Sequence, residues 1–296
     1  MTAVTVLTNP VAGNGRAATV SEAVISRLRE RGAHVTTIEG RTPNDALEST
    51  KRAVRAGCEA LVAVGGDGLV NLALQAVART STSLAVAPAG TGNDFARLLG
   101  VPLDSPAAAA DIVMDARVRA IDLGRAQDRW FATVLSSGFD SLVTERANRM
   151  RWPTGPLRYN VAMMLELTKL RPISYTVELD GDAFDVDATL VTVGNGPTYG
   201  GGMAICPSAV VDDGLLDVTV VRASSRTRLI RLSPTLYRGT HVSLPEVQTY
   251  TAKTVVLTAP GMTAYADGER FCALPVRIEC VARAADVLVG RSSVLA

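Results

Sequence analysis

The chain has 296 residues, of which 47% are hydrophobic and 20% are charged, and its formal net charge is +1. This balance is typical of a folded protein with room for two domains, and it argues against disorder and against nucleic acid as a partner. No apolar run reaches the roughly eighteen residues of a membrane span, and the first residues enter a strand pattern without a leader. The four cysteines stand far apart without CxxC spacing, so we expect reduced thiols and a cytoplasmic protein.

In the first third of the chain, strand patterns alternate with helix patterns. The expected strands are 4–7, 34–38, 60–64 and 83–87, and the expected helices are 17–31, 45–56 and 69–79. A further helix is expected to begin at Ser105-Pro106. Such alternation predicts parallel strands joined by right-handed crossovers. The predicted unit is therefore a doubly wound α/β domain with its ligands at the carboxyl ends of the strands.

Three loops of this domain carry glycine directly after a strand. Asn9 to Gly15 follows the first strand, Gly65-Gly66-Asp67-Gly68 follows the third, and Pro88 to Arg97 follows the fourth. Glycines let backbone N–H groups approach an anion, and a helix N-terminus adds the positive end of its dipole. The loops predict a phosphate site held mostly by backbone amides, because neither a P-loop nor a dinucleotide fingerprint occurs. For one such loop alone, a tight turn without a ligand is the alternative interpretation.

From about residue 121 the pattern changes to short β-branched segments separated by Asp-Gly turns. The expected strands are 175–179, 189–193, 216–221, 254–257 and 276–281, with helices at 160–169 and 226–236. This texture predicts a second, largely β domain, a sandwich. Both histidines, His34 and His241, stand away from the glycine loops, so any general base is predicted to be a carboxylate.

Taken together and in order, the motifs of this chain resemble the soluble bacterial diacylglycerol kinase family, which belongs with the lipid and sphingosine kinases. They are most similar to its mycobacterial-type members, and the resemblance covers almost the whole chain. The motifs are Asn9 to Gly13, Gly65 to Gly68, Pro88 to Arg97, Asp122-Leu123-Gly124, Gly138-Phe139-Asp140, Tyr199 to Gly202, Cys206-Pro207, Asp212 to Asp217 and Asp267-Gly268-Glu269.

The resemblance implies a Rossmann-like ATP-binding domain over residues 1–123 and a β-sandwich lipid-substrate domain over 124–283, with 284–296 returning to the first. It implies an active site in the cleft between them, where ATP and Mg²⁺ serve to phosphorylate the primary hydroxyl of diacylglycerol, giving phosphatidic acid. The nucleotide-binding residues that it implies are Asn9, Pro10, Val11, Ala12, Gly13, Gly65, Gly66, Asp67, Gly68, Leu69, Val70, Asn71, Thr91 and Asn93.

The resemblance also implies the acidic groups of the site. A structural Mg²⁺ would be held by the Asp213 carboxylate and the backbone carbonyls of Val210 and Leu215, and Asp213 would also belong to the acidic network around catalytic Mg²⁺. The catalytic residues that it implies are Asp67, Asp122, Asp267 and Glu269. Either Asp267 or Glu269 would accept the proton of the lipid hydroxyl. We favour Asp267, with Glu269 organising metal and water.

Each of these carboxylates has a simpler interpretation. The Asp-Gly pairs could be ordinary turns, which is the interpretation that we keep for Asp180. Asp94 could be a helix N-cap and Asp122 could close a strand.

Two leucines depart from the usual family loop, in which a Thr follows GGDG and a Glu follows the Asn. Here Leu69 and Leu72 stand at those positions, so no side-chain hydroxyl reaches a phosphate from residue 69. The substrate also stays open between diacylglycerol and other lipid alcohols such as sphingosine or ceramide. An NAD kinase-like enzyme and a binding module without turnover are the rival functions.

Arginines mixed with Met, Trp and Tyr between Arg146 and Tyr159 predict peripheral contact with an anionic membrane during catalysis. A solvated face over a packed aromatic is the alternative. A second basic series, from Arg222 to Arg238, is explained adequately as the polar face of a helix. Whether the chain forms a homodimer is left open.

Overall fold

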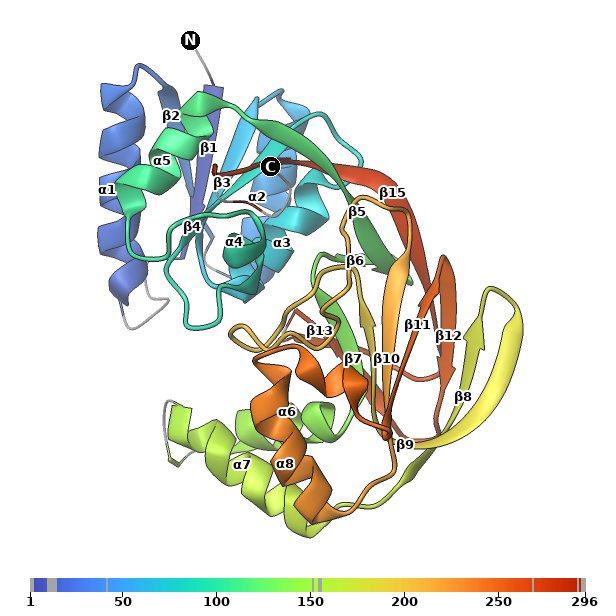
Figure 1. Cartoon of the computed structure of the whole chain (residues 1–296). Coiled ribbons are helices and arrows are strands. Elements are labelled where there is room, and N and C mark those ends of the chain that lie inside the picture. The colour runs from blue at the N-terminus through green and yellow to red at the C-terminus, as the bar shows by residue number, and fades with distance from the viewer. Residues whose placement is uncertain are drawn as a thin grey trace.

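Two units of different architecture make up the molecule, an α/β unit and a β unit with three helices at one end (Figure 1). The computed structural model describes residues 3–9, 15–40, 42–150, 152–153, 156–267, 269–291 and 293. The predicted nucleotide contacts Pro10, Val11, Ala12 and Gly13 lie outside the described residues.

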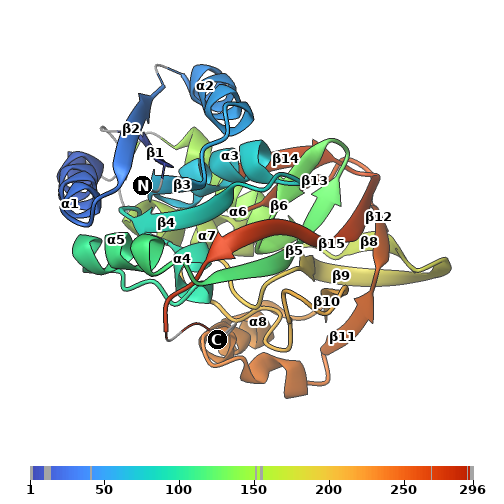
Figure 2. The ribbon, with the colours of Figure 1, turned by 90° about the horizontal axis from the view of Figure 1, so that it is seen from above.

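The first unit alternates strands and helices along the chain. Its elements are β1 (Ala3–Thr8), α1 (Arg16–Glu30), β2 (His34–Glu39), α2 (Pro43–Arg55), β3 (Ala60–Gly65), α3 (Asp67–Val77), β4 (Ser83–Pro88), α4 (Asp94–Leu98) and α5 (Pro106–Asp115). The parallel strands run in the order β2-β1-β3-β4. Helices α1 and α5 pack together, as do α2 and α3, and Figure 2 shows the two pairs on opposite faces of the sheet. The predicted doubly wound α/β domain is confirmed.

Burial explains why these segments take these places. All six residues of β3 are buried, because this strand lies between two others and has helices over both faces. The edge strand β2 is mostly exposed. Helix α5 starts where predicted: the Ser105 hydroxyl accepts a hydrogen bond from the backbone N–H of Ala108, and Pro106 occupies the first turn.

The second unit is mostly antiparallel β-structure. Its elements are β5 (Val118–Ala126), β6 (Arg129–Phe131), β7 (Val134–Gly138), α6 (Phe139–Arg149), α7 (Pro156–Thr168), β8 (Ile173–Leu179), β9 (Asp182–Gly194), β10 (Leu216–Arg222), α8 (Arg226–Leu236), the 3₁₀ helix η2 (Thr240–Ser243), β11 (Val247–Ala252), β12 (Thr254–Thr258), β13 (Thr263–Ala266), β14 (Glu269–Ala273) and β15 (Val276–Leu288). The strands run in the order β14-β13-β7-β9-β8-β12-β15, and β10 and β11 branch from β9. A separate apolar core, which includes Tyr175, Val193, Val218 and Ile278, lies under them.

Two long strands, β5 and β15, join the units, as Figure 1 shows. They pair with each other, and the end of β15 pairs in parallel with β4 through Val287 and Leu84. Val287, Leu288 and Val289 belong to the core of the first unit. The end of the described chain thus returns to the α/β unit. We keep the division at residues 123 and 283 as a proposal.

The structure differs from the sequence predictions where apolar periodicity is weak or segments are short. Helix α6 was not predicted, and neither were β6, β7, β11, β13 and β14. Helix α7 begins at Pro156 rather than at residue 160. Asp122 lies inside β5, so the interpretation in which it closes a strand was wrong.

Candidate active site

Asp67 stands at the first turn of α3, directly after the buried strand β3. Its carboxylate accepts hydrogen bonds from the backbone N–H groups of Asn93, at 2.9 Å, and Asp94, at 3.0 Å. Burial raises the pKa of the Asp67 carboxyl, and the nearby charge of Asp94 raises it further. One carboxylate thus ties the first glycine loop to the second.

The glycines of these loops are required by close approach. A Cβ built on Gly90 would lie 2.5 Å from the Cα of Gly66, and one on Gly92 would lie 2.4 Å from an Asp67 carboxylate oxygen. Any larger residue would push the two loops apart. The side chain of Leu69 folds back over Gly65, whose Cβ would lie 2.7 Å from the leucine Cδ2. Leu69 and Leu72 both pack against the core of the α/β unit, which gives these two departures from the family loop a structural role.

Asp94 joins the two units. Its carboxylate is buried and accepts hydrogen bonds from the backbone N–H groups of Gly201, at 2.8 Å, and Gly202, at 2.7 Å. Residues 200 to 202 all have positive φ, between 61° and 100°, a conformation that glycine adopts without strain and that turns successive N–H groups toward an anion. The N-cap of α4 is Asn93, whose side chain bonds to Gly90 instead. The interpretation of Asp94 as a simple N-cap was therefore wrong.

Asp267 lies at the same junction, at the end of β13. Its backbone has φ 49°, and its carboxylate accepts four hydrogen bonds. The donors are the Asn71 side-chain amide on α3, the backbone N–H groups of Ala132 and Thr133, and the Thr133 hydroxyl, at 2.6 to 3.2 Å. These bonds link α3 of the first unit to the β6–β7 segment of the second.

Glu269 completes this group. Its side chain is exposed, and a Cβ on Gly68 would lie 2.9 Å from its Oε1. The Glu269 carboxylate therefore rests against the first turn of α3, one residue from Asp67. Gly68 is required at this place for the same reason as Gly90 and Gly92. The structure brings Asp67, Asn71, Asp267 and Glu269 together from distant parts of the chain, and we name these four residues the junction group.

Asp122 and Asp213 form a separate arrangement. The Asp122 carboxylate is only 1% exposed and accepts hydrogen bonds from the backbone N–H groups of Gly214, at 2.6 Å, and Arg283, at 2.7 Å. Asp213 is exposed and accepts the N–H of Leu215 at 2.9 Å. The contacts of Asp122 thus hold the 213–214 turn against the irregular part of β15 rather than reaching the junction group.

The remaining predicted residues are placed around the two loops. Asn9 directly follows β1, which neighbours β3, so Asn9 lies at the same end of the sheet as the loops after β3 and β4. Thr91 is exposed on the second loop, and Asn93 is buried within it. Val210 is exposed and Leu215 half-buried beside the Asp213 turn. Gly268 lies outside the described residues.

The donor set fits a magnesium ion that arrives with a nucleotide. Within the described ranges, no group of three or more Asp, Glu, His or Cys side chains could hold a metal alone. Mg²⁺ takes oxygen ligands and often uses one or two carboxylates together with water and substrate phosphates. Asp67 and Glu269 offer such carboxylates at Gly68. Asp213, with carbonyls of its own turn, offers the same class of donor.

Sequence reasoning gave no role to Asp140, which belongs to a second polar cluster behind β7. Its carboxyl accepts the N–H of Ser141, and burial raises its pKa. Burial and the charge of Asp140 raise the pKa of Tyr199 well above its ordinary value, and burial raises that of Tyr175 to about 12. The Gly138-Phe139-Asp140 motif marked this place in the sequence, but a motif does not reveal which hydroxyls surround it.

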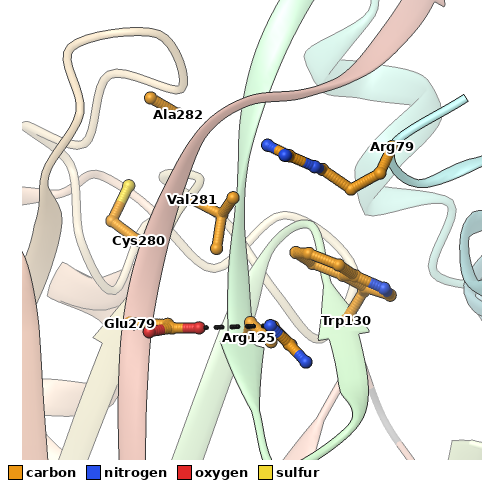
Figure 3. Close-up of a pocket in the computed structure, with 7 residues that line it drawn as sticks. All are labelled: Arg79, Arg125, Trp130, Glu279, Cys280, Val281 and Ala282. Carbon is orange, nitrogen blue, oxygen red and sulfur yellow. Dashed lines mark ion pairs between the residues drawn. The ribbon is translucent and has the colours of Figure 1, made fainter.

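A groove of about 620 Å³ is lined by none of the junction group, although its Trp130 accepts a hydrogen bond from Asn71 through its backbone carbonyl (Figure 3). Arg125 stacks over Trp130, 5.3 Å from the ring centroid, and pairs with Glu279 at 3.5 Å. Arg79 reaches toward the same groove from beyond the C-terminus of α3, whereas the junction group surrounds its N-terminus. The groove contains none of the residues predicted to bind nucleotide or metal.

Comparison with known proteins defines the class to which this arrangement belongs. Residues 3–126 match the model of the diacylglycerol kinase catalytic domain, and residues 133–289 match that of the YegS C-terminal NAD kinase beta sandwich-like domain. The chain therefore belongs to the family of diacylglycerol kinases and YegS-like lipid kinases, and it is a kinase. The resemblance inferred from the motifs is confirmed.

Individual relatives agree with this assignment. The chain is 49% identical to a diacylglycerol kinase of Mycobacterium tuberculosis, over 97% of this chain and 95% of the relative. It is 30% identical to a diacylglycerol kinase of Bacillus subtilis, over 72% and 70% of the two chains. It is also 32% identical to a YegS-like lipid kinase of Xanthomonas campestris, over 86% of each. A crystal structure of a diacylglycerol kinase from Bacillus anthracis has the same fold, with a TM-score of 0.79 at 23% identity over 99% of this chain and 98% of that one.

Proposed function

We propose that this kinase transfers the γ-phosphate of ATP to the primary hydroxyl of diacylglycerol, giving phosphatidic acid, at the junction of its two units. The observation that carries the proposal is the junction group, in which carboxylates from both units meet at the glycine loop that begins α3. The high identity to a relative named diacylglycerol kinase supports the choice of acceptor.

The proposed nucleotide site uses the loops after β1, β3 and β4. The phosphates would contact the segments 9–13 and 65–71 through backbone N–H groups, which Pro10 lacks, with Thr91 and Asn93 on the neighbouring loop. The first turn of α3 contributes the positive end of its dipole. Asp67 holds the second loop against the first, so the donors stand in place before the nucleotide binds. Little energy is then spent on ordering these loops during the reaction.

Asp67 and Glu269 would hold the Mg²⁺ that accompanies ATP. Each Asp67 oxygen accepts one backbone N–H and keeps a second lone-pair direction, so metal binding does not require the loop contacts to break. When bound, Mg²⁺ neutralises phosphate charge as the phosphoryl group is transferred. We also propose that Asp213, with the carbonyls of Val210 and Leu215, holds a structural Mg²⁺, and that Asp122 supports that turn.

The acceptor hydroxyl would lose its proton to Asp267 or Glu269. The four donors on Asp267 occupy the two lone-pair directions of each oxygen, so it can accept a proton only when one donor yields as the lipid binds. Glu269 is exposed and oriented by fewer contacts. We propose that Asp267 receives the proton and that Glu269 organises metal and water, with Mg²⁺ dependence separating the two roles.

The function is tested by labelled ATP and a panel of acceptors. Diacylglycerol, monoacylglycerol, sphingosine and ceramide are offered in mixed micelles, and NAD is offered as a soluble acceptor. We expect label in phosphatidic acid, with a diacylglycerol kcat/KM above that of every other acceptor. Label in NAD, or faster transfer to a sphingoid base, would contradict the proposal.

A further inference from the structure

Three helices at the end of the β unit expose a concentration of apolar side chains. Within the described part of the chain, ten large hydrophobic residues are exposed, and eight of them lie on α6, α7 and α8 or beside these helices. The exposed fraction reaches 81% for Trp152 and 60% for Met164. We name this set the helical face: Leu142, Trp152, Leu157, Met163, Met164, Leu165, Ile230 and Tyr237. Single exposed apolar residues are ordinary, but a concentration of this kind marks an interaction surface.

The three helices are bound to one another, so the helical face belongs to one assembly (Figure 1). Arg146 of α6 pairs with Glu166 of α7, and Arg226 of α8 donates to the carbonyl of Thr168 at the end of α7. Ala147 and Ala162 are buried between α6 and α7. On α7, residues 157, 164 and 165 share one side by helical spacing and are exposed, whereas Leu167 is buried.

The same segments carry a local excess of positive charge. Residues 139–171 and 224–239 contain ten basic and three acidic side chains, a net +7 in a chain whose total is +1. Salt bridges neutralise Arg146, Arg149 and Arg228. Arg231 and Arg238 are exposed and have no carboxylate partner among the described residues. Lys169 and Arg171, after α7, are exposed as well and form no ion pair within the described residues. The unneutralised charge therefore lies after α7, on α8 and just beyond α8, and the sequence alone explained the series from Arg222 to Arg238 as an ordinary polar face.

We propose that the helical face docks the protein on an anionic lipid bilayer. Apolar side chains beside unpaired arginines match the chemistry of such a surface, in which acyl chains lie beneath negative headgroups. A second copy of this chain fits poorly, because two faces of like charge would repel. None of the described helices is both long and apolar enough to cross a bilayer, so the contact would be with its surface. The inference rests on the proposed function, in which the acceptor is a membrane lipid.

The helical face also lies within reach of the junction group. Strand β7 begins at Val134, whose carbonyl accepts the N–H of Asp267 at 3.2 Å, and ends at Gly138, where α6 begins. Five strand residues span about 17 Å. Docking through α6–α8 would therefore hold the junction group a short distance above the headgroups. The predicted segment from Arg146 to Tyr159 is one part of this larger surface, and Arg151 lies outside the described residues.

Vesicle sedimentation without ATP tests the proposal. The probes are vesicles of phosphatidylcholine alone and of phosphatidylcholine mixed with phosphatidylglycerol, across a salt series. The variants are Arg231→Gln/Arg238→Gln and Met164→Ser/Ile230→Ser. The matched controls are Arg55→Gln, an exposed arginine of α2, and Val118→Ser, an exposed valine of β5.

We expect the parent to bind the anionic vesicles and to be released as salt rises, because screening shortens from about 10 Å at 0.1 M to about 3 Å at 1 M. The arginine pair should weaken binding about 25-fold, and the apolar pair by at least tenfold. The controls should bind as the parent does. If the Met164→Ser/Ile230→Ser variant does not fold, the Arg231→Gln/Arg238→Gln variant alone tests the proposal, because both of its arginines are exposed and their replacement should leave the fold intact.

Equal vesicle binding by parent and arginine pair would overturn the proposal. So would a parent dimer, measured by light scattering, that these substitutions dissociate, because the face would then join two copies. Failure of the proposed function gives a different result: the parent would bind vesicles and still transfer no phosphate to diacylglycerol.

Discussion

The polar side chains at the junction have hydrogen-bond partners within the protein, whereas the charged side chains beside the helical face do not have carboxylate partners within the described residues. At the junction, Asp67, Asp94 and Asp267 each accept two or more hydrogen bonds from the protein, mostly from backbone N–H groups of another loop. Beside the exposed apolar chains of the helical face, Arg231 and Arg238 are exposed and have no carboxylate partner in the part of the chain that the structure describes. Side chains whose hydrogen bonds are all made within the protein are held in fixed positions, which suits a reacting site. Exposed apolar and charged side chains without partners in the protein are suited to binding an external surface. The predictions below probe this division.

The largest effect is expected from Asp67→Ala. It removes a proposed metal ligand and both hydrogen bonds that hold the second glycine loop, so kcat should fall about a thousandfold. The free energy of unfolding should also fall by about 1–3 kcal/mol, because two N–H groups lose a charged acceptor. Turnover and chemical unfolding are measured together. The control is Asp180→Ala, which removes a carboxylate that accepts N–H groups of Lys253 and Thr254 in a distant turn. A turnover of Asp67→Ala within a few fold of the parent would refute its catalytic role.

Asp267→Asn and Glu269→Gln separate two roles within the junction group. If Asp267 accepts the proton, its amide variant should lower kcat by roughly a hundredfold to ten-thousandfold. The variant should also be less stable, because the new NH₂ group faces donors on every side. Glu269→Gln should instead raise the Mg²⁺ concentration needed for half activity. Rescue of Asp267→Asn by excess Mg²⁺, without rescue of Glu269→Gln, would reverse the two roles.

Asp94→Asn tests whether the junction needs its link between units. One N–H of Gly201 or Gly202 would then face an amide donor, so the loop should shift from the position that Asp94 holds. We expect the free energy of unfolding to fall by about 1–3 kcal/mol. Turnover should drop less than in Asp67→Ala, since Asp94 positions other groups. Hydrogen exchange at residues 200–202 provides the check, and unchanged protection there would contradict the link.

The smallest effect concerns pH and lies outside both regions. Burial lowers the pKa of His241, which is fully buried with its Nε2 3.1 Å from the carbonyl of Ile205. The unfolded histidine binds a proton below about pH 6.5, whereas the folded one stays neutral to lower pH. The stability contribution is therefore complete above about pH 6.5 and is lost as pH falls through the folded pKa. His241→Gln should flatten the stability profile between about pH 7 and 5, measured by chemical unfolding. An unchanged slope would contradict this role.

The sequence predicted the first unit well because its local patterns and its fold agree. Buried runs such as 60–64, helix starts such as Ser105-Pro106 and glycines after strands all report local requirements. The contacts of the site depend on long-range pairing, which no local pattern records. That Asp267 accepts a hydrogen bond from Asn71, and that Asp122 bonds to Arg283, follows only when β13 and β15 are in place. The helical face was missed in part because exposure depends on which sides of α7 and α8 find partners.

One experiment compares the two regions on one substrate. Transfer of labelled phosphate to a dispersed short-chain diacylglycerol, which needs no bilayer, is measured for the parent, for Asp67→Ala and for Arg231→Gln/Arg238→Gln. We predict that the parent forms phosphatidic acid, that Asp67→Ala loses about a thousandfold in kcat, and that the arginine pair stays within about threefold of the parent. Loss of the reaction in the arginine pair with Asp67→Ala still active would contradict the division between a catalytic junction and a docking face.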